Sequence, residues 1–139
     1  MEYKRFGDKI VLRLDKGDEI TESVISVAQK EGVSLAEISG IGATDDFTVG
    51  VFDMAKSVYD SFSYNGNHEI TSLTGNITEM NGKTYQHIHI TCAGKNGFVG
   101  GHLLRAKISL TAEIFINILS GKIDRRKDEN LKINTLYFY

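Results

Sequence analysis

Three of the four histidines in this 139-residue chain lie between positions 87 and 102. His87 and His89 are separated by one residue within the alternating segment 86–91. Because successive side chains of a strand point to opposite faces, we expect both imidazoles on one face, roughly 7 Å apart along the strand. His102 follows two glycines, which allow the backbone to approach another element closely or to adopt a positive φ, and we expect a tight turn to bring the third imidazole beside the first two.

This pattern suits a metal ion. Neutral imidazole is a good zinc ligand, and catalytic zinc sites combine three protein ligands with an open fourth position. The sequence therefore predicts a metal site formed by His87, His89 and His102, against the alternative that the pair consists of ordinary surface residues. The fourth histidine, His68, lies beside the turn signal Asn65-Gly66-Asn67 and is expected to be an exposed turn residue.

Glu113 is the carboxylate that could join this chemistry. It lies between Thr111 and Phe115 on the polar face of an alternating segment. A carboxylate in such a place serves as an ion-pair partner, as a group that orients a metal ligand, or as a general base. Glu113 is therefore a candidate catalytic residue, with a solvated or salt-bridged glutamate as the alternative.

Other polar or glycine-rich segments favour structural roles. Gly40-Ile41-Gly42-Ala43 lacks the third glycine of a dinucleotide-binding fingerprint and favours a close crossing of two backbone segments, so no cofactor-binding residues are predicted. The one basic cluster is interrupted by Asp124 and followed by acidic residues, which favours a solvated loop over a weak phosphate contact. Its members are Lys122, Arg125, Arg126 and Lys127. Cys92 alternates onto the same face as Ile90 and is expected in the core.

Hydrophobic periodicity predicts the elements that must position these residues. Apolar residues near a 3.6-residue period predict one main helix over Glu19–Glu31, with Asp18 as its N-cap and Gly32 at its end. The segment 107–119 could be helical by composition, but apolar residues occupy every second position from Ile108 to Ile118, which favours one long strand. Further strands are predicted over 9–14, 36–39, 46–53, 57–64, 69–79, 83–92 and 132–139, with a turn at Asn81-Gly82.

These elements predict an α+β fold, with a mostly antiparallel sheet and one main helix packed on it, in a single compact domain over residues 1–139. The net charge of −2 excludes an overall basic field. A single cysteine excludes an intrachain disulfide, and no segment approaches the ~20 apolar residues of a membrane span. The charged N-terminus lacks a signal-peptide pattern, so we expect a soluble cytoplasmic protein with no membrane partner.

Several motifs in the second half of the chain stand in a recognisable order. They are Ser72-Leu73-Thr74-Gly75-Asn76-Ile77, His87-Ile88-His89, Gly100-Gly101-His102-Leu103-Leu104 and Thr111-Ala112-Glu113-Ile114. Together with Gly40-Ile41-Gly42-Ala43 and Val49-Gly50-Val51-Phe52-Asp53, they resemble the PPC (plants and prokaryotes conserved) domain, also catalogued as a domain of unknown function and called PD1-like DNA-binding. The resemblance covers about residues 10–120 and is closest to prokaryotic stand-alone members.

The resemblance implies a homotrimer and a zinc triad at His87, His89 and His102. Plant members of the family carry an Arg-Gly-Arg-Pro AT-hook that binds the minor groove of DNA, an element this chain lacks. Their partner-binding stretch corresponds here to Gly66–Thr71, which lacks the arginine and the aromatic residue, so partner specificity does not carry over.

Three functions remain open on the sequence alone. The first is a DNA-associated or regulatory homotrimer in which the zinc is structural or sensory. The second is a zinc-dependent enzyme acting on a small molecule, with Glu113 as its base or as a group that orients a ligand. The third is an assembly scaffold, because the strand over 107–119 carries apolar residues on both faces.

Overall fold

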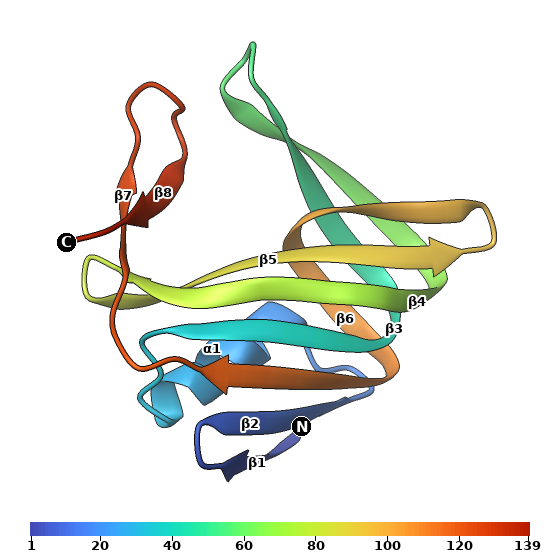
Figure 1. The fold of residues 1–139 in the computed structure, drawn as a ribbon. Helices are drawn as coiled ribbons and strands as arrows, with labels where there is room; N and C mark the ends of the chain where they lie inside the picture. Colours follow the sequence, from blue (N-terminus) through green and yellow to red (C-terminus); the bar gives the residue numbers. More distant parts are fainter.

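Eight strands and one helix make up the computed structural model, which describes all residues 1–139 (Figure 1). The elements are β1 Glu2–Phe6, β2 Lys9–Asp15, α1 Ile20–Lys30, β3 Ala36–Asp53, β4 Val58–Met80, β5 Lys83–Gly94, β6 Gly97–Ile118, β7 Asp124–Lys127 and β8 Asn134–Tyr137. The α+β class, the mostly antiparallel sheet and the single main helix are thus confirmed. No helix in the structure has the length and apolar character needed to cross a lipid bilayer.

All eight strands belong to one sheet, with the path β1-β2-β6-β3-β4-β7-β8. Strand β5 lies off this path and pairs with β4 and β6. Because β3 also pairs with β4 and β6, these four long strands close into a ring of ladders. The β7–β8 hairpin joins the sheet through a single parallel pair, Glu79 with Asp124.

The ring of long strands, β2 and the inner face of α1 together form one core of 24 buried residues. Alternation explains the strand contribution: Ile10, Leu12 and Leu14 of β2 are all fully buried, as predicted. Helix α1 contributes Val24 and Val27 to the same core and packs against β5 and β6. The buried thiol of Cys92 confirms its predicted place in the core.

The predicted N-cap of α1 is wrong by one residue. Glu19, not Asp18, caps the helix, and its Oε2 accepts a hydrogen bond from the backbone N–H of Glu22 at 2.7 Å. Its other oxygen, Oε1, accepts a hydrogen bond from the backbone N–H of Ala106 on β6 at 2.8 Å. The Glu19 side chain, which is longer than that of Asp18, therefore accepts from backbone N–H groups of both α1 and β6. The Asp18 carboxylate instead accepts from the backbone N–H of Asp15 in the preceding turn.

The turn predicted at Asn65-Gly66-Asn67 is also wrong, because β4 runs through it without interruption. Gly66 has a φ of 92°, and the β3–β4 register shifts opposite it, between Thr44 and Asp46. The glycine therefore accommodates a bulge rather than a chain reversal. His68 is consequently half-buried rather than an exposed turn residue, with its ring centroid 5.1 Å from that of Phe47.

The strand predicted over 107–119 is confirmed and begins earlier, at Gly97. One of its alternating apolar residues, Leu110, is nevertheless 71% exposed. Pairing with β3 jumps from Thr44↔Ile108 to Gly42↔Ala112, and this irregularity turns Leu110 outward. The close crossing predicted at Gly40-Ile41-Gly42 is confirmed here, because a Cβ on Gly42 would lie 2.6 Å from the carbonyl oxygen of Thr111.

Candidate metal centre

The three histidines of the predicted site are neighbours across the β5–β6 ladder. His89 on β5 pairs directly with His102 on β6, and His87 lies two residues before His89 on the same face. Their potential ligand nitrogens all lie within 4.8 Å of one another. His102, however, is not on a glycine turn: it lies inside β6, and the hairpin reverses five residues earlier, between Gly94 and Gly97.

The two glycines before His102 allow a close approach of backbones, which is one of the two roles predicted for them, and they do not form a turn. A Cβ on Gly100 would lie 2.5 Å from the carbonyl oxygen of Ile90 on β5, and a Cβ on Gly101 would lie 2.8 Å from that of Gly50 on β3. Only glycine permits such close approach of the backbones. His102 thereby pairs with β5 on one edge and with β3 on the other, at the point where β6 passes from one partner to the next.

The environment of His87 and His102 favours their neutral forms. Burial lowers the pKa of His87 to about 4, and the positive charges of His102, Arg125 and His89 oppose its protonation further. Burial also lowers the pKa of His102, with His89 and Arg125 acting in the same direction. Neutral imidazoles have a free lone pair, which is the form that binds metals.

The geometry of the cluster fits a metal ion. The Nε2 atoms of His87 and His89 are 3.3 Å apart. Two ligands at the usual zinc–nitrogen distance of about 2.0–2.1 Å in a tetrahedral site are separated by about 3.3 Å, so the spacing matches. The Nδ1 atom of His102 is buried and has no hydrogen-bond partner, which leaves it in need of a partner such as an ion. A set of three imidazoles suits zinc, copper, iron and nickel.

Arg125 lies beside the cluster, and this corrects the prediction of a solvated basic loop. The residue belongs to β7 and is only 5% exposed. Its guanidinium donates to the Thr78 hydroxyl, to the carbonyl oxygen of Asn134 and to the amide oxygen of Asn76, at 2.8–3.1 Å, and it stacks on the ring of Tyr85. Of the other three basic residues, Lys122 pairs with Glu79 at 2.6 Å, while Arg126 and Lys127 are exposed.

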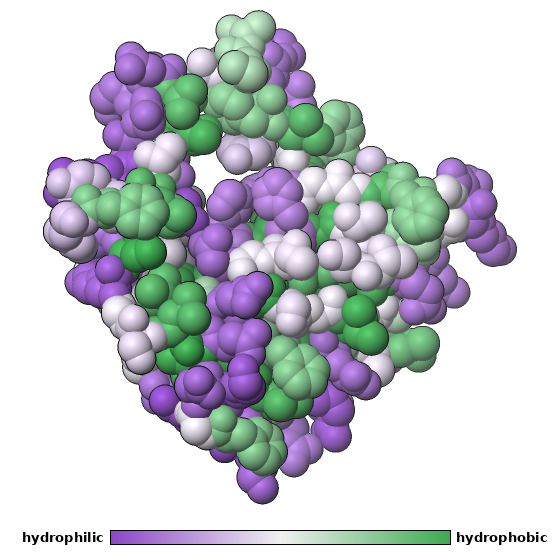
Figure 2. Space-filling view, viewed as in Figure 1, coloured by the Kyte–Doolittle hydropathy of each residue, from purple (hydrophilic) through white to green (hydrophobic).

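A cavity of about 230 Å³ opens beside His87 and His102. One wall comes from the tip of the β3–β4 hairpin, where the Tyr59 ring lies over His102 with 5.0 Å between ring centroids. The opposite wall comes from Arg125 and the β7–β8 turn. Figure 1 shows these two hairpins on the same side of β5, and the space-filling view shows a hollow between them (Figure 2).

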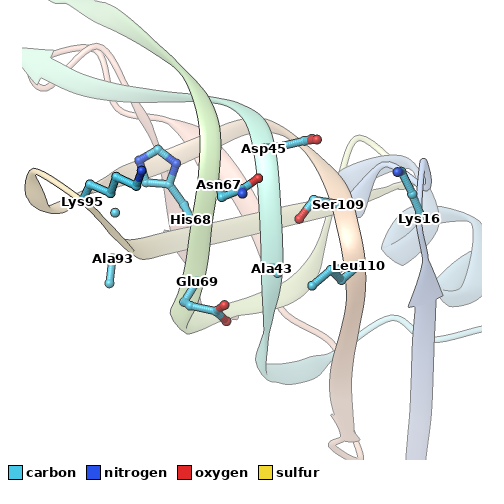
Figure 3. A pocket seen from close by; sticks show the side chains of 11 residues that line it. Lys16, Ala43, Asp45, Asn67, His68, Glu69, Ala93, Lys95, Ser109 and Leu110 are labelled. Atoms are coloured by element: carbon cyan, nitrogen blue, oxygen red, sulfur yellow. The ribbon is translucent and has the colours of Figure 1, made fainter.

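The candidate catalytic residue Glu113 and the fourth histidine, His68, lie outside this site. Glu113 is eleven residues beyond His102 on β6, roughly 35 Å of strand at the usual rise, and its side chain is exposed opposite Arg13. His68 lines a different cavity, of about 400 Å³, together with Lys95, Glu69 and Asp45 (Figure 3). The structure therefore brings His87, His89 and His102 together and leaves Glu113 and His68 apart from them.

Sequence reasoning missed three residues of the site: Arg125, Tyr85 and Tyr59. Tyr85 precedes His87 by two positions, so its place on the same face of β5 follows from strand alternation. Arg125 and Tyr59 reach the site from hairpins far away in sequence. No local pattern in the chain indicates that contact.

Comparisons with known proteins agree with the fold and bear on the metal. Residues 1–120 match the model of the Plants and Prokaryotes Conserved (PCC) domain. The chain is 30% identical to a "putative DNA-binding protein" of known structure from Bacteroides thetaiotaomicron, with a TM-score of 0.95 over 99% of this chain and 96% of that one. No curated protein matches the sequence.

Two further solved structures are similar over most of their length. A metal-containing protein from Archaeoglobus fulgidus is 30% identical, with a TM-score of 0.89 over 99% of this chain and 97% of that one. A plant- and prokaryote-conserved (PPC) protein from Pyrococcus horikoshii is 28% identical, with a TM-score of 0.83 over 94% of this chain and 90% of that one.

Proposed function

Because this chain belongs to the Plants and Prokaryotes Conserved domain family, we propose that it is a metal-binding domain in which His87, His89 and His102 hold a zinc ion. The observation that carries the proposal is the convergence of the three imidazoles, with 3.3 Å between two of their nitrogens. The similar A. fulgidus protein, which is described as metal-containing, supports it.

Three protein ligands leave a fourth zinc position open, and the cavity beside His87 and His102 is where an added ligand would reach it. Bound zinc acts as a Lewis acid and lowers the pKa of a coordinated water. The chain's own residues supply neutral donors and a partly enclosed cavity. Glu113 has no part in this proposal, because it lies on a distant section of β6.

Metal binding is tested by titrating the metal-free protein with Co²⁺ and by measuring bound zinc in the purified protein. His102→Ala and His87→Ala each remove one of three ligands, so we expect each to lower metal affinity at least tenfold. His68→Ala is the matched control, since it removes an imidazole from another cavity and should leave affinity unchanged. Equal metal affinity in wild type and His102→Ala would refute the proposal.

A DNA-associated regulatory role is the second candidate, supported by the description of the B. thetaiotaomicron structure. In this chain the basic cluster contributes only Arg126 and Lys127 as exposed cations without a carboxylate partner, because Lys122 pairs with Glu79, and the net charge is −2. Electrostatic binding to DNA is strongest at low salt. A fluorescence titration with duplex DNA at low salt should therefore show binding that weakens steeply with added salt, and absence of binding at low salt would remove this candidate.

We further propose that the chain forms a homotrimer, as its family resemblance implies. The supporting observation is a group of apolar side chains on the outer face of β3 and β6. Ile41, Leu110 and Phe115 are 57%, 71% and 44% exposed. Ile41 shares one surface cleft with Leu110 and another with Phe115, so these side chains form one apolar face that association would cover.

A further inference from the structure

We propose that the cavity beside the histidine cluster is a binding site for a small carboxylic acid, whose carboxylate lies between Arg125 and the metal-binding histidines. This inference rests on the proposed metal site for one side of the ligand. The other side of the ligand would contact Arg125; Lys132, the second cation of the lining, already pairs with Glu129 at 3.3 Å. The two parts can therefore be tested separately.

Arg125 brings an uncompensated positive charge to the cavity. A buried charge is costly unless it is paired, and Arg125 is 5% exposed. Its three hydrogen-bond acceptors, on Thr78, Asn134 and Asn76, are all neutral. None of the eleven residues that line the cavity is acidic, and a zinc ion on the histidines would add two further positive charges to the same cavity. A bound anion would supply the negative charge that the protein does not place in this cavity.

Arg125 also has hydrogen-bond donors that no protein group uses. A guanidinium has five N–H donors, and the three bonds to protein use one each from Nε, Nη1 and Nη2. One N–H therefore remains on each terminal nitrogen. The bonds to protein and the stacking on Tyr85 fix the plane of the group, so these two donors are held in place before a ligand arrives.

The composition of the cavity walls favours a carboxylate on an apolar body over inorganic phosphate. Five of the eleven lining residues are apolar or aromatic. They are Phe52, Val58, Tyr59, Tyr85 and Ile133. The volume of about 230 Å³ is below the range of drug-sized pockets, so the ligand is a small molecule. Two N–H donors match the two oxygens of one carboxylate, whereas a phosphate would leave further oxygens without donors.

Benzoate is a suitable probe, and benzamide is its neutral counterpart of the same shape. Both are titrated by calorimetry into the Co²⁺-loaded protein and into the metal-free protein, with inorganic phosphate as a third ligand. We expect benzoate to bind at least tenfold more tightly than benzamide or phosphate, because only benzoate brings both charge and an apolar ring. Its binding should also change the absorption spectrum of the bound Co²⁺.

Arg125→Lys retains the charge but loses the planar pair of donors, so we expect about a tenfold or greater loss of benzoate affinity. Arg126→Lys is the matched control, because Arg126 is the next residue along β7, is exposed and does not line the cavity. Thermal unfolding shows whether each variant is folded. If Arg125→Lys does not fold, the comparison of benzoate with benzamide on wild type decides the question.

The outcomes separate this inference from the proposed metal site. Equal binding of benzoate and benzamide, or an equal effect of the two arginine variants, would overturn the carboxylate site even where Co²⁺ binds normally. Phosphate binding as tightly as benzoate would overturn the choice of a carboxylate. Protein that takes up no metal but binds benzoate through Arg125 would support the carboxylate site and refute the metal site.

Discussion

Arg125 and the histidines beside it hold their charge states for different reasons. A guanidinium stays protonated even where burial lowers its pKa, so Arg125 is a fixed cation. Burial and that cation lower the pKa of His87 to about 4, so its imidazole is neutral at neutral pH. Arg125 thus helps to keep a metal ligand neutral, and its own buried charge favours the binding of an anion.

Cys92 provides a test of the core at the scale of one residue. Burial raises the pKa of its thiol to about 12, against about 8.5 for a free cysteine. Because only the thiolate reacts, we expect negligible labelling by a thiol reagent at pH 8 in the folded protein and rapid labelling in denaturant. Rapid labelling of the folded protein would show that β5 is not packed as described.

The same shift has a consequence for stability. The folded protein holds the thiol proton more tightly than the unfolded chain. The resulting contribution to the unfolding free energy is complete below about pH 8.5 and is lost as pH rises toward 12. Cys92→Ser cannot serve as the comparison at high pH, because it buries a hydroxyl in place of the thiol. Cys92→Ala removes the titrating group, and its unfolding midpoint should fall less between pH 8.5 and 10 than that of wild type.

At the scale of elements, the position of β5 depends on glycines in the strands around it. A Cβ on Gly75 of β4 would lie 2.2 Å from the carbonyl oxygen of His87, so Gly75→Ala must move the backbone that carries the histidines. We expect a loss of about 2 kcal/mol in unfolding free energy, together with weaker Co²⁺ binding. Denaturant titration and metal titration measure the two effects.

Thr74→Ala is the control for this prediction. Thr74 is the preceding residue on β4, is exposed, and should change the unfolding free energy by less than about 0.5 kcal/mol. If Gly75→Ala were as stable as Thr74→Ala, the close approach of β4 and β5 at His87 would be wrong.

Hydrophobic periodicity was sufficient to predict most of the strands and the helix, and to place His87 and His89 of the site on one face. Strand alternation places His87 and His89 together, and it separates them from Ile88 and Ile90 in the core. The helix and the long strand through Glu113 also follow from local patterns. These features depend only on residues close together in the sequence.

The parts that could not be predicted depend on contacts between distant segments. Gly66 gives a turn signal, but the register between β3 and β4 determines that it accommodates a bulge instead. Arg125 lies in a charged sequence, yet acceptors on Thr78 and Asn76 hold it in the interior. The N-cap shifts from Asp18 to Glu19 because Glu19 also binds Ala106 on β6.

At the scale of the whole molecule, the apolar face of Ile41, Leu110 and Phe115 predicts association. Introducing a charge into a buried interface is costly, so Phe115→Glu should convert a trimer into monomers at equal protein concentration. Ultracentrifugation measures the mass. Phe138→Glu is the control, since Phe138 is 69% exposed near the end of the chain, away from β3 and β6. A monomeric wild-type protein would contradict the trimer directly.

The attachment of the β7–β8 hairpin has a kinetic consequence. The hairpin meets the ring of long strands through one backbone pair, the Arg125 side chain and a hydrogen bond from Asn134 to Tyr85, and it contributes no residue to the 24-residue core. Local opening of the hairpin would therefore leave that core intact. Opening withdraws one wall of the cavity and gives an ion or ligand a route in and out while the rest of the molecule stays folded. By thermodynamic linkage, a ligand that contacts Arg125 only in the closed state stabilises that state, so the open state is less populated while the ligand is bound.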